Sequence, residues 1–163
     1  NLSGQQVNNV EGSGADPSVQ SSAVNLDLPA IAAGWAQIAD ITYNGAQTNP
    51  STSGWGTVSD LKVVHVAGDL SVSGNNIGAG VLVVDGNFQM GGTFNYNGVI
   101  IVLGDADIVG GGNAKQVVGG LMVQGTLTGT TNVNGNVKLL YTSAMINQLY
   151  SLTRYEISSW IDQ

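Results

Sequence analysis

The chain has 163 residues, of which 42% are hydrophobic and only 9% are charged, and its net charge is −7. Its hydrophobic content excludes a chain that stays disordered, and four Lys and Arg residues are too few for a basic surface that neutralises nucleic-acid phosphates. The absence of cysteine excludes disulfides and thiolate metal sites, and no apolar run approaches the ~18 residues of a membrane span.

The first quarter of the chain predicts a lead-in and a helix. Residues 1–25 are polar and rich in Gly and Ser, which favours an extended lead-in or a capping strand. Residues 28–39 are predicted as a short amphipathic helix, with Asp27 as N-cap and Pro29 in the first turn. The apolar positions that share one face of this helix are Leu28, Ile31, Trp35 and Ile38.

A repeated sequence motif dominates the region from 41 to 141. A short apolar run ends in Val, any residue and Gly four times, with the glycines at 68, 86, 104 and 125, so the steps are 18, 18 and 21 residues. Such a step is too short for a strand-helix-strand unit, which needs about 30 residues, but it suits one coil of a β-solenoid. We therefore predict an all-β, single-stranded parallel β-solenoid of four to five coils over residues 41–141, with 41–60 as an irregular first coil.

The C-terminal part is predicted to complete the same single domain, 1–163. Residues 142–152 form a second short amphipathic helix, capped by Thr142 or Ser143, and residues 153–163 form a closing strand. Aromatic residues there are expected to cover the open edge of the last coil, because an unpaired strand edge invites association.

The columns of the repeat separate a core from a surface. Relative to each repeat glycine, the residues four and two before it and two after it are apolar in every copy, and side chains alternate along a strand, so these columns point inward. The column three after the glycine is polar throughout and faces water. Its members are Ser71, Gln89, Asp107 and Thr128.

The outward column three before the glycine is the candidate interaction site. It holds His65, Val83, Ile101 and Met122. Three large apolar side chains at a strand spacing of about 4.8 Å are costly to leave in water, since burying each contributes roughly 1.5–3 kcal/mol. We expect this stripe to be covered, either by one of the two helices or by another protein chain.

The residues directly after the glycines predict a ladder at the turns. They are Asp69, Asn87, Asp105 and Thr126. Side chains of this kind bond the backbone of loops, which favours a ladder of such bonds. A calcium site with Asp85 beside Asp69 or Asp105 is the alternative.

No catalytic, metal or cofactor-binding residue is assigned. His65 is the only histidine and lies in an apolar column, where a packed or edge histidine is expected rather than a catalytic one. Lys115 follows Gly110–Gly112 without the pattern of a phosphate-binding loop. The chain is therefore predicted to be no enzyme and to need no cofactor.

The segments 63–74 and 78–112 resemble the Gly-rich β-helical domain of bacterial PilX-like pilus-assembly proteins. The order that follows, Leu139–Ser143, a short helix and Ile157–Trp160, fits the same family, as does the helix at Leu28-Pro29. This resemblance covers about residues 25–163. The chain also resembles bactofilin-type β-helices, more distantly. The hydrophobic pilin-like N-terminal helix of the family is missing, so we expect either an excised ectodomain or a domain that works without that anchor.

The resemblance implies a structural or adhesive module, extracellular or at the bacterial cell surface and associated with a pilus or filament. Its partners would be proteins, including further copies of itself. Two alternatives remain at this stage. One is a pilus-tip module that binds DNA, through Lys62, Lys115, Lys138 and Arg154, or glycan; the other is a cytoplasmic polymer-forming scaffold.

Overall fold

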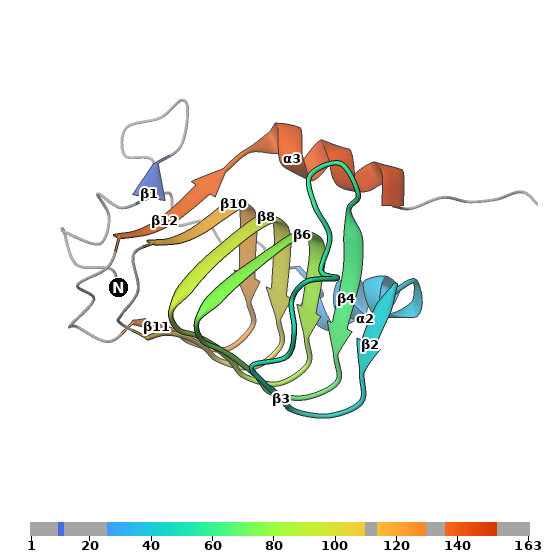
Figure 1. Ribbon diagram of the computed structural model, residues 1–163. Coiled ribbons are helices and arrows are strands. Elements are labelled where there is room, and N and C mark those ends of the chain that lie inside the picture. The colour runs from blue at the N-terminus through green and yellow to red at the C-terminus, as the bar shows by residue number, and fades with distance from the viewer. Residues whose placement is uncertain (1–9, 12–25, 110–113, 130–135, 153–163) are drawn as a thin grey trace, which may run out of the picture.

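The computed structural model describes residues 10–11, 26–109, 114–129 and 136–152. Within these ranges the chain winds into about four turns of a parallel β-solenoid and carries two short helices (Figure 1). The predicted all-β solenoid is therefore confirmed. The expected closing strand at 153–163 and most of the lead-in at 1–25 lie outside the described residues.

The described strands form two sheets in which every neighbour is parallel. Seven of them make one sheet in the order β1-β12-β10-β8-β6-β4-β2, and five make the other in the order β11-β9-β7-β5-β3. Their bounds are β1 (Val10–Glu11), β2 (Ile41–Tyr43), β3 (Gln47–Thr48), β4 (Lys62–Val66), β5 (Leu70–Val72), β6 (Asn75–Val84), β7 (Phe88–Met90), β8 (Thr93–Val102), β9 (Ala106–Ile108), β10 (Ala114–Val123), β11 (Leu127–Gly129) and β12 (Asn136–Tyr141).

The three long strands β6, β8 and β10 each turn a corner, which gives a regular coil three sides. Gly80, Gly98 and Gly119 lie in register at this corner with φ of 124°, 145° and 139°. Figure 1 shows each long strand rising, turning and running down again. We call the halves before the corner, with β1 and β12, face 1. The halves after it, with β2 and β4, are face 2, and the five-stranded sheet is face 3.

Inward side chains from all three faces fill an inner core. Val66, Val84 and Val102 pair in register and have no exposed surface, and Val123 packs against them in the next coil. The predicted inward file of like-placed valines is confirmed. Leu127 belongs to the inward column two residues after the repeat glycine, on face 3. It is 43% exposed because it lies on β11, the outermost described strand of its sheet.

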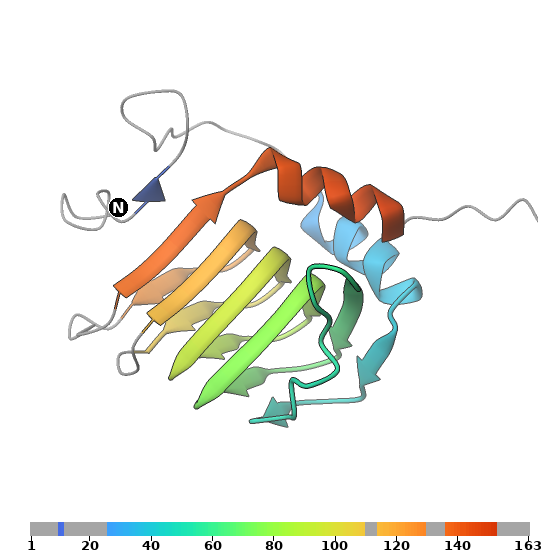
Figure 2. The same ribbon diagram turned by 45° about the horizontal axis from the view of Figure 1, so that its top comes forward.

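Face 2 is apolar on both of its sides, and its outward side forms a second, outer core. Val81, Val83 and Ile101 have no exposed surface although they alternate with inward residues, because the two helices pack over them. Figure 2 shows α2 (Leu28–Gln37) and α3 (Ser143–Gln148) side by side on this side of the solenoid. A sheet covered on both sides requires the continuous apolar runs seen in β6 and β8.

The first helix, α2, packs on β4 and β6. Asp27 caps it as predicted: its Oδ1 accepts a hydrogen bond from the Ala30 backbone N at 3.1 Å. The helix ends at Gln37 rather than at 39, because Asp40 already bonds to the sheet through its N–H to Val63 O at 2.8 Å. Ile38 is therefore 46% exposed, and Ala32 is the buried residue of the helix.

The second helix, α3, packs on β8 and β10 and continues as the 3-10 turn η1 (Leu149–Leu152). Thr142 occupies the N-cap position, but its side chain makes no capping hydrogen bond. Met145 and Leu149 are buried in the outer core, as the amphipathic pattern predicts. Among the described residues, no helix is long and apolar enough to cross a membrane.

The two ends of the solenoid are finished differently. At the last coil, β1 of the lead-in pairs with β12, Val10 opposite Leu139, so part of the lead-in is the capping strand that its composition favoured. At the first coil, the irregular segment that follows β3 covers face 1: the Ala79 backbone N donates to Trp55 O at 2.9 Å. Trp55 is fully buried in the inner core.

Replacing Gly98 with Ala should destabilise the fold by at least about 2 kcal/mol, because its positive φ is strained for any side chain. In addition, a Cβ there would overlap the carbonyl oxygen of Gly80 in the coil below. Urea unfolding followed by circular dichroism measures the change in the free energy of unfolding.

The matched control for this substitution is Gly34→Ala in the exposed part of α2, where a Cβ meets nothing within 4 Å. It should stabilise the protein by about 0.5–1 kcal/mol, since alanine is the better helix former. Equal effects of the two substitutions would show that Gly98 does not form a tight corner.

Candidate functional site

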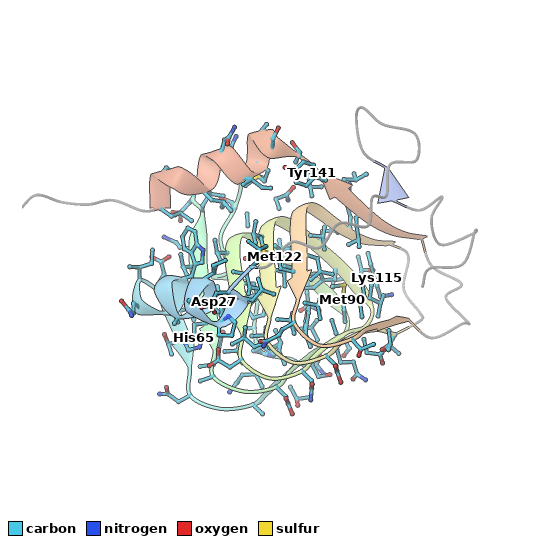
Figure 3. The ribbon with its side chains drawn as sticks, turned by 180° about the vertical axis from the view of Figure 1, so that it is seen from behind. Asp27, His65, Met90, Lys115, Met122 and Tyr141 are labelled. Atoms are coloured by element: carbon cyan, nitrogen blue, oxygen red, sulfur yellow. The ribbon has the colours of Figure 1, made fainter. Side chains whose placement is uncertain are left out.

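The apolar stripe selected from the sequence lies under the helices. Val83 and Ile101 have no exposed surface, and Met122 is partly buried and packs against the outer core (Figure 3). These side chains contact α2 and α3 as members of one cluster. Another chain could reach Val83 or Ile101 only by displacing a helix, whereas Met122 keeps some exposed surface.

His65, at the first-coil end of the stripe, forms an ion pair across two coils when it is protonated. Its Nε2 lies 2.9 Å from Oδ2 of Asp85, and the two side chains are 14% and 41% exposed. The pair occupies Asp85, which the calcium alternative had placed beside Asp69 or Asp105. No group of three or more His, Asp or Glu residues in the described part of the chain is arranged to hold a metal ion.

The predicted ladder at the turns is present, and each rung joins one coil to the next. The Asn87 backbone N donates to Asp69 Oδ1 at 2.7 Å, and the Asp105 backbone N donates to Asn87 Oδ1 at 2.9 Å. The Thr126 backbone N donates to Asp105 Oδ1 at 2.7 Å. Each Asp or Asn side chain therefore satisfies the turn of the following coil.

The repeat glycines make room for this ladder. A Cβ on Gly86 would collide with Asp69 Oδ1, one on Gly104 would collide with Asn87 Oδ1, and one on Gly125 with Asp105 Oδ1. The backbones also approach closely, since Gly86 N donates to Gly68 O at 3.0 Å. The glycine and the Asp or Asn that follows it are thus one structural unit, which explains why they recur together.

Beside the ladder, the outward residues of face 3 form a second polar column. Ser71 Oγ donates to Gln89 Oε1 at 3.0 Å, and Thr128 Oγ1 donates to Asp107 Oδ1 at 3.1 Å. The ladder residues lie two positions before this column, in the turns that lead into strands about 4.8 Å apart. Together they make a fixed surface of amide, hydroxyl and carboxylate groups, which we call the ladder face.

Polar groups inside the solenoid were not foreseen. Lys115, which is labelled in Figure 3, is 2% exposed. The strand register places it on face 1 in one inward file with Phe94 and Asn76. Burial lowers the pKa of its ammonium group. The hydroxyl of Tyr96 is buried and has no hydrogen-bond partner among the described residues, and burial raises its pKa.

A signal for Lys115 was present in the sequence. It lies two residues before the buried Val117, so alternation along β10 places both side chains on the same side. The repeat glycines carry the same signal, because Lys115 lies ten residues before Gly125, just as Phe94 lies ten residues before Gly104.

Comparison with known proteins gives no match to a family model, to a curated protein or to a solved structure. The ladder face therefore has to be interpreted from its own chemistry. It can hold coils in register and offer a regular array of hydrogen-bonding groups to a polar surface.

Replacing Asn87 with Ala should destabilise the protein by about 0.5–1.5 kcal/mol, because the Asp105 amide loses its acceptor. The control is Gln89→Ala, two residues away on the same face, where only a bond between side chains is lost. It should cost less than about 0.5 kcal/mol. Thermal and urea unfolding measure the free energy of unfolding of both variants. A larger loss for Gln89→Ala than for Asn87→Ala would contradict the role of the ladder.

Proposed function

We propose that this chain is a non-enzymatic structural or adhesive module of the bacterial cell surface, associated with a pilus or filament. The observation that carries the proposal is the ladder, in which the side chains of Asp69, Asn87 and Asp105 are each bound to the next coil. Polar groups used in this way stiffen a rod and fix its surface. A module that bears mechanical load, or that presents a binding surface, requires such stiffness and a fixed surface.

The double burial of face 2 supports the same role. The inner core holds coil on coil, and the outer core fastens both helices along the stack. A helix that spans several strands resists the sliding of one coil past another, because each buried Val or Ile side chain contributes roughly 1.5–3 kcal/mol. Such cross-bracing suits a domain exposed to shear.

The association with a pilus or filament rests on the resemblance of segments 63–74 and 78–112 to PilX-like pilus-assembly proteins. The structure weakens the argument for DNA binding, which the sequence had left open as an alternative. Of the four cations it required, Lys115 is inside the solenoid and Lys62 Nζ lies 3.0 Å from Asp60 Oδ1. A buried lysine does not reach a phosphate.

Mechanical shearing of intact cells tests the proposal. In the bacterium that makes this protein, filaments sheared from the surface should carry the chain, detected with an antibody raised against the purified protein. The antibody should also label the outside of unbroken cells by electron microscopy. A cytoplasmic marker enzyme, which should stay with the cells, controls for lysis.

Recovery of the chain only with the cytoplasmic marker would contradict the surface role. If the purified protein also polymerised end to end, that result would favour the cytoplasmic scaffold. Binding of the intact protein to DNA at low salt, with loss on raising the salt concentration, would favour the nucleic-acid alternative.

A further inference from the structure

The tripeptide Tyr-Asn-Gly occurs twice in the described part of the chain, at 43–45 and at 96–98. An Asn that precedes Gly loses ammonia readily, because Gly has no side chain to shield the backbone nitrogen that attacks the Asn side chain. A third Asn-Gly pair, at 134–135, lies outside the described residues. The two Tyr-Asn-Gly copies share their local sequence, so the fold determines any large difference in their reactivity.

The first copy forms the turn between β2 and β3, at the first-coil end of the solenoid (Figure 1). The Asn44 side chain is exposed to water. Gly45 has a φ of 103°, and a Cβ added to it would meet nothing within 4 Å. The turn therefore has open space in which the Asn44 side chain can approach the Gly45 nitrogen.

The glycine N–H of the same turn is engaged in later coils but not in the first. Gly86 N donates to Gly68 O at 3.0 Å, and Gly125 N donates to Gly104 O at 3.1 Å, so each turn is bound to the coil before it. No described coil precedes the first one, and the Gly45 N–H has no acceptor among the described residues. Its nitrogen is thus free to react.

The second copy lies at the corner of β8, where the fold prevents the same approach. Gly98 is buried and pairs with Gly80 in the coil before it and with Gly119 in the coil after it. A Cβ on Gly98 would overlap Gly80 O, which shows how closely the backbones are stacked. Attack on the half-buried Asn97 would require this part of β8 to leave the sheet.

We propose that Asn44 is a site of spontaneous covalent modification, in which the Gly45 nitrogen attacks the Asn44 side-chain carbon Cγ. The N–Cγ bond forms and the Cγ–Nδ2 bond breaks, and ammonia leaves with the proton from the Gly45 amide. The cyclic imide that remains is opened by water at either of its carbonyl groups. The products carry an aspartyl or an isoaspartyl residue at position 44, and water is the only co-reactant.

The isoaspartyl product changes the first coil, because it lengthens the backbone between β2 and β3 by one carbon. Two hydrogen bonds hold this connection on the next coil: Ala67 N donates to Tyr43 O at 2.9 Å, and Gln47 N donates to Asp69 O at 2.8 Å. A longer connection cannot keep both bonds in register. The modification therefore loosens β2 and β3 and leaves the later coils intact.

Peptide mass spectrometry of the full-length protein tests the proposal. The protein is kept folded in mildly alkaline buffer, and digestion with pepsin at acidic pH stops the reaction at each time point. Asn44 should convert at least about tenfold faster than Asn97, because reaction at Asn97 first requires backbone hydrogen bonds to be broken. In concentrated urea the two sites should convert at similar rates. Equal rates in the folded protein would overturn the proposal.

The variant Gln124→Asn provides a matched control for the free N–H. It places an Asn-Gly pair in the same turn of the last coil, where position 124 is exposed and the N–H of Gly125 is engaged. Circular dichroism should show an unchanged fold, and position 124 should convert more slowly than Asn44 in the same sample. Conversion at position 124 as fast as at Asn44 would overturn the assigned cause.

Hydrogen exchange measures the effect on the first coil. In the isoaspartyl form, separated from the parent by ion exchange, the amides of Gln47 and Ala67 should exchange faster than before. The amide of Phe88, which donates to Asp105 O at 2.8 Å in a later coil, should keep its protection. Unchanged exchange at Gln47 and Ala67, or equal loss of protection at Phe88, would contradict a loosening confined to the first coil.

Discussion

The structure depends on the register with which each coil lies on the one before it. That register is set at the turns, where an Asp or Asn side chain of one coil accepts a hydrogen bond from the backbone of the next, at 2.7–2.9 Å. A slip by one residue would turn every inward side chain outward, because side chains alternate along a strand. The ladder therefore protects the inner core, and the core in turn excludes water from the strands that carry the ladder.

The two cores stabilise different contacts: the inner core holds successive coils together, and the outer core holds the helices on the coils. The inner core is made of like-placed residues from successive coils, whereas the outer core joins α2 and α3 to one face of the stack. Because α2 comes before the coils and α3 comes after them, the outer core also ties distant parts of the chain together. The result is a braced rod with one polar, regular side, and this arrangement is the physical basis of the proposed structural role.

The sequence predicted the repeat, the inward columns and the turn ladder, because each follows from residues a fixed number of positions apart. The corner glycines were missed although Gly80, Gly98 and Gly119 repeat at the same steps of 18 and 21 residues as the glycines of the turns. The pairing of β1 with β12 could not be predicted, since two residues carry no periodicity. The stripe at Val83 and Ile101 was recognised as needing cover, but only tertiary packing determines that two helices share it.

Methyl-methyl nuclear Overhauser contacts in the full-length protein test the stacking most directly. The account predicts cross-peaks between Val66 and Val84, between Val84 and Val102, and between Val102 and Val123, which are paired in register in successive coils. Strands about 4.8 Å apart place these methyl groups well within range. Cross-peaks that instead join each valine to a residue one position away in the next coil, or their absence from a folded sample, would contradict the account.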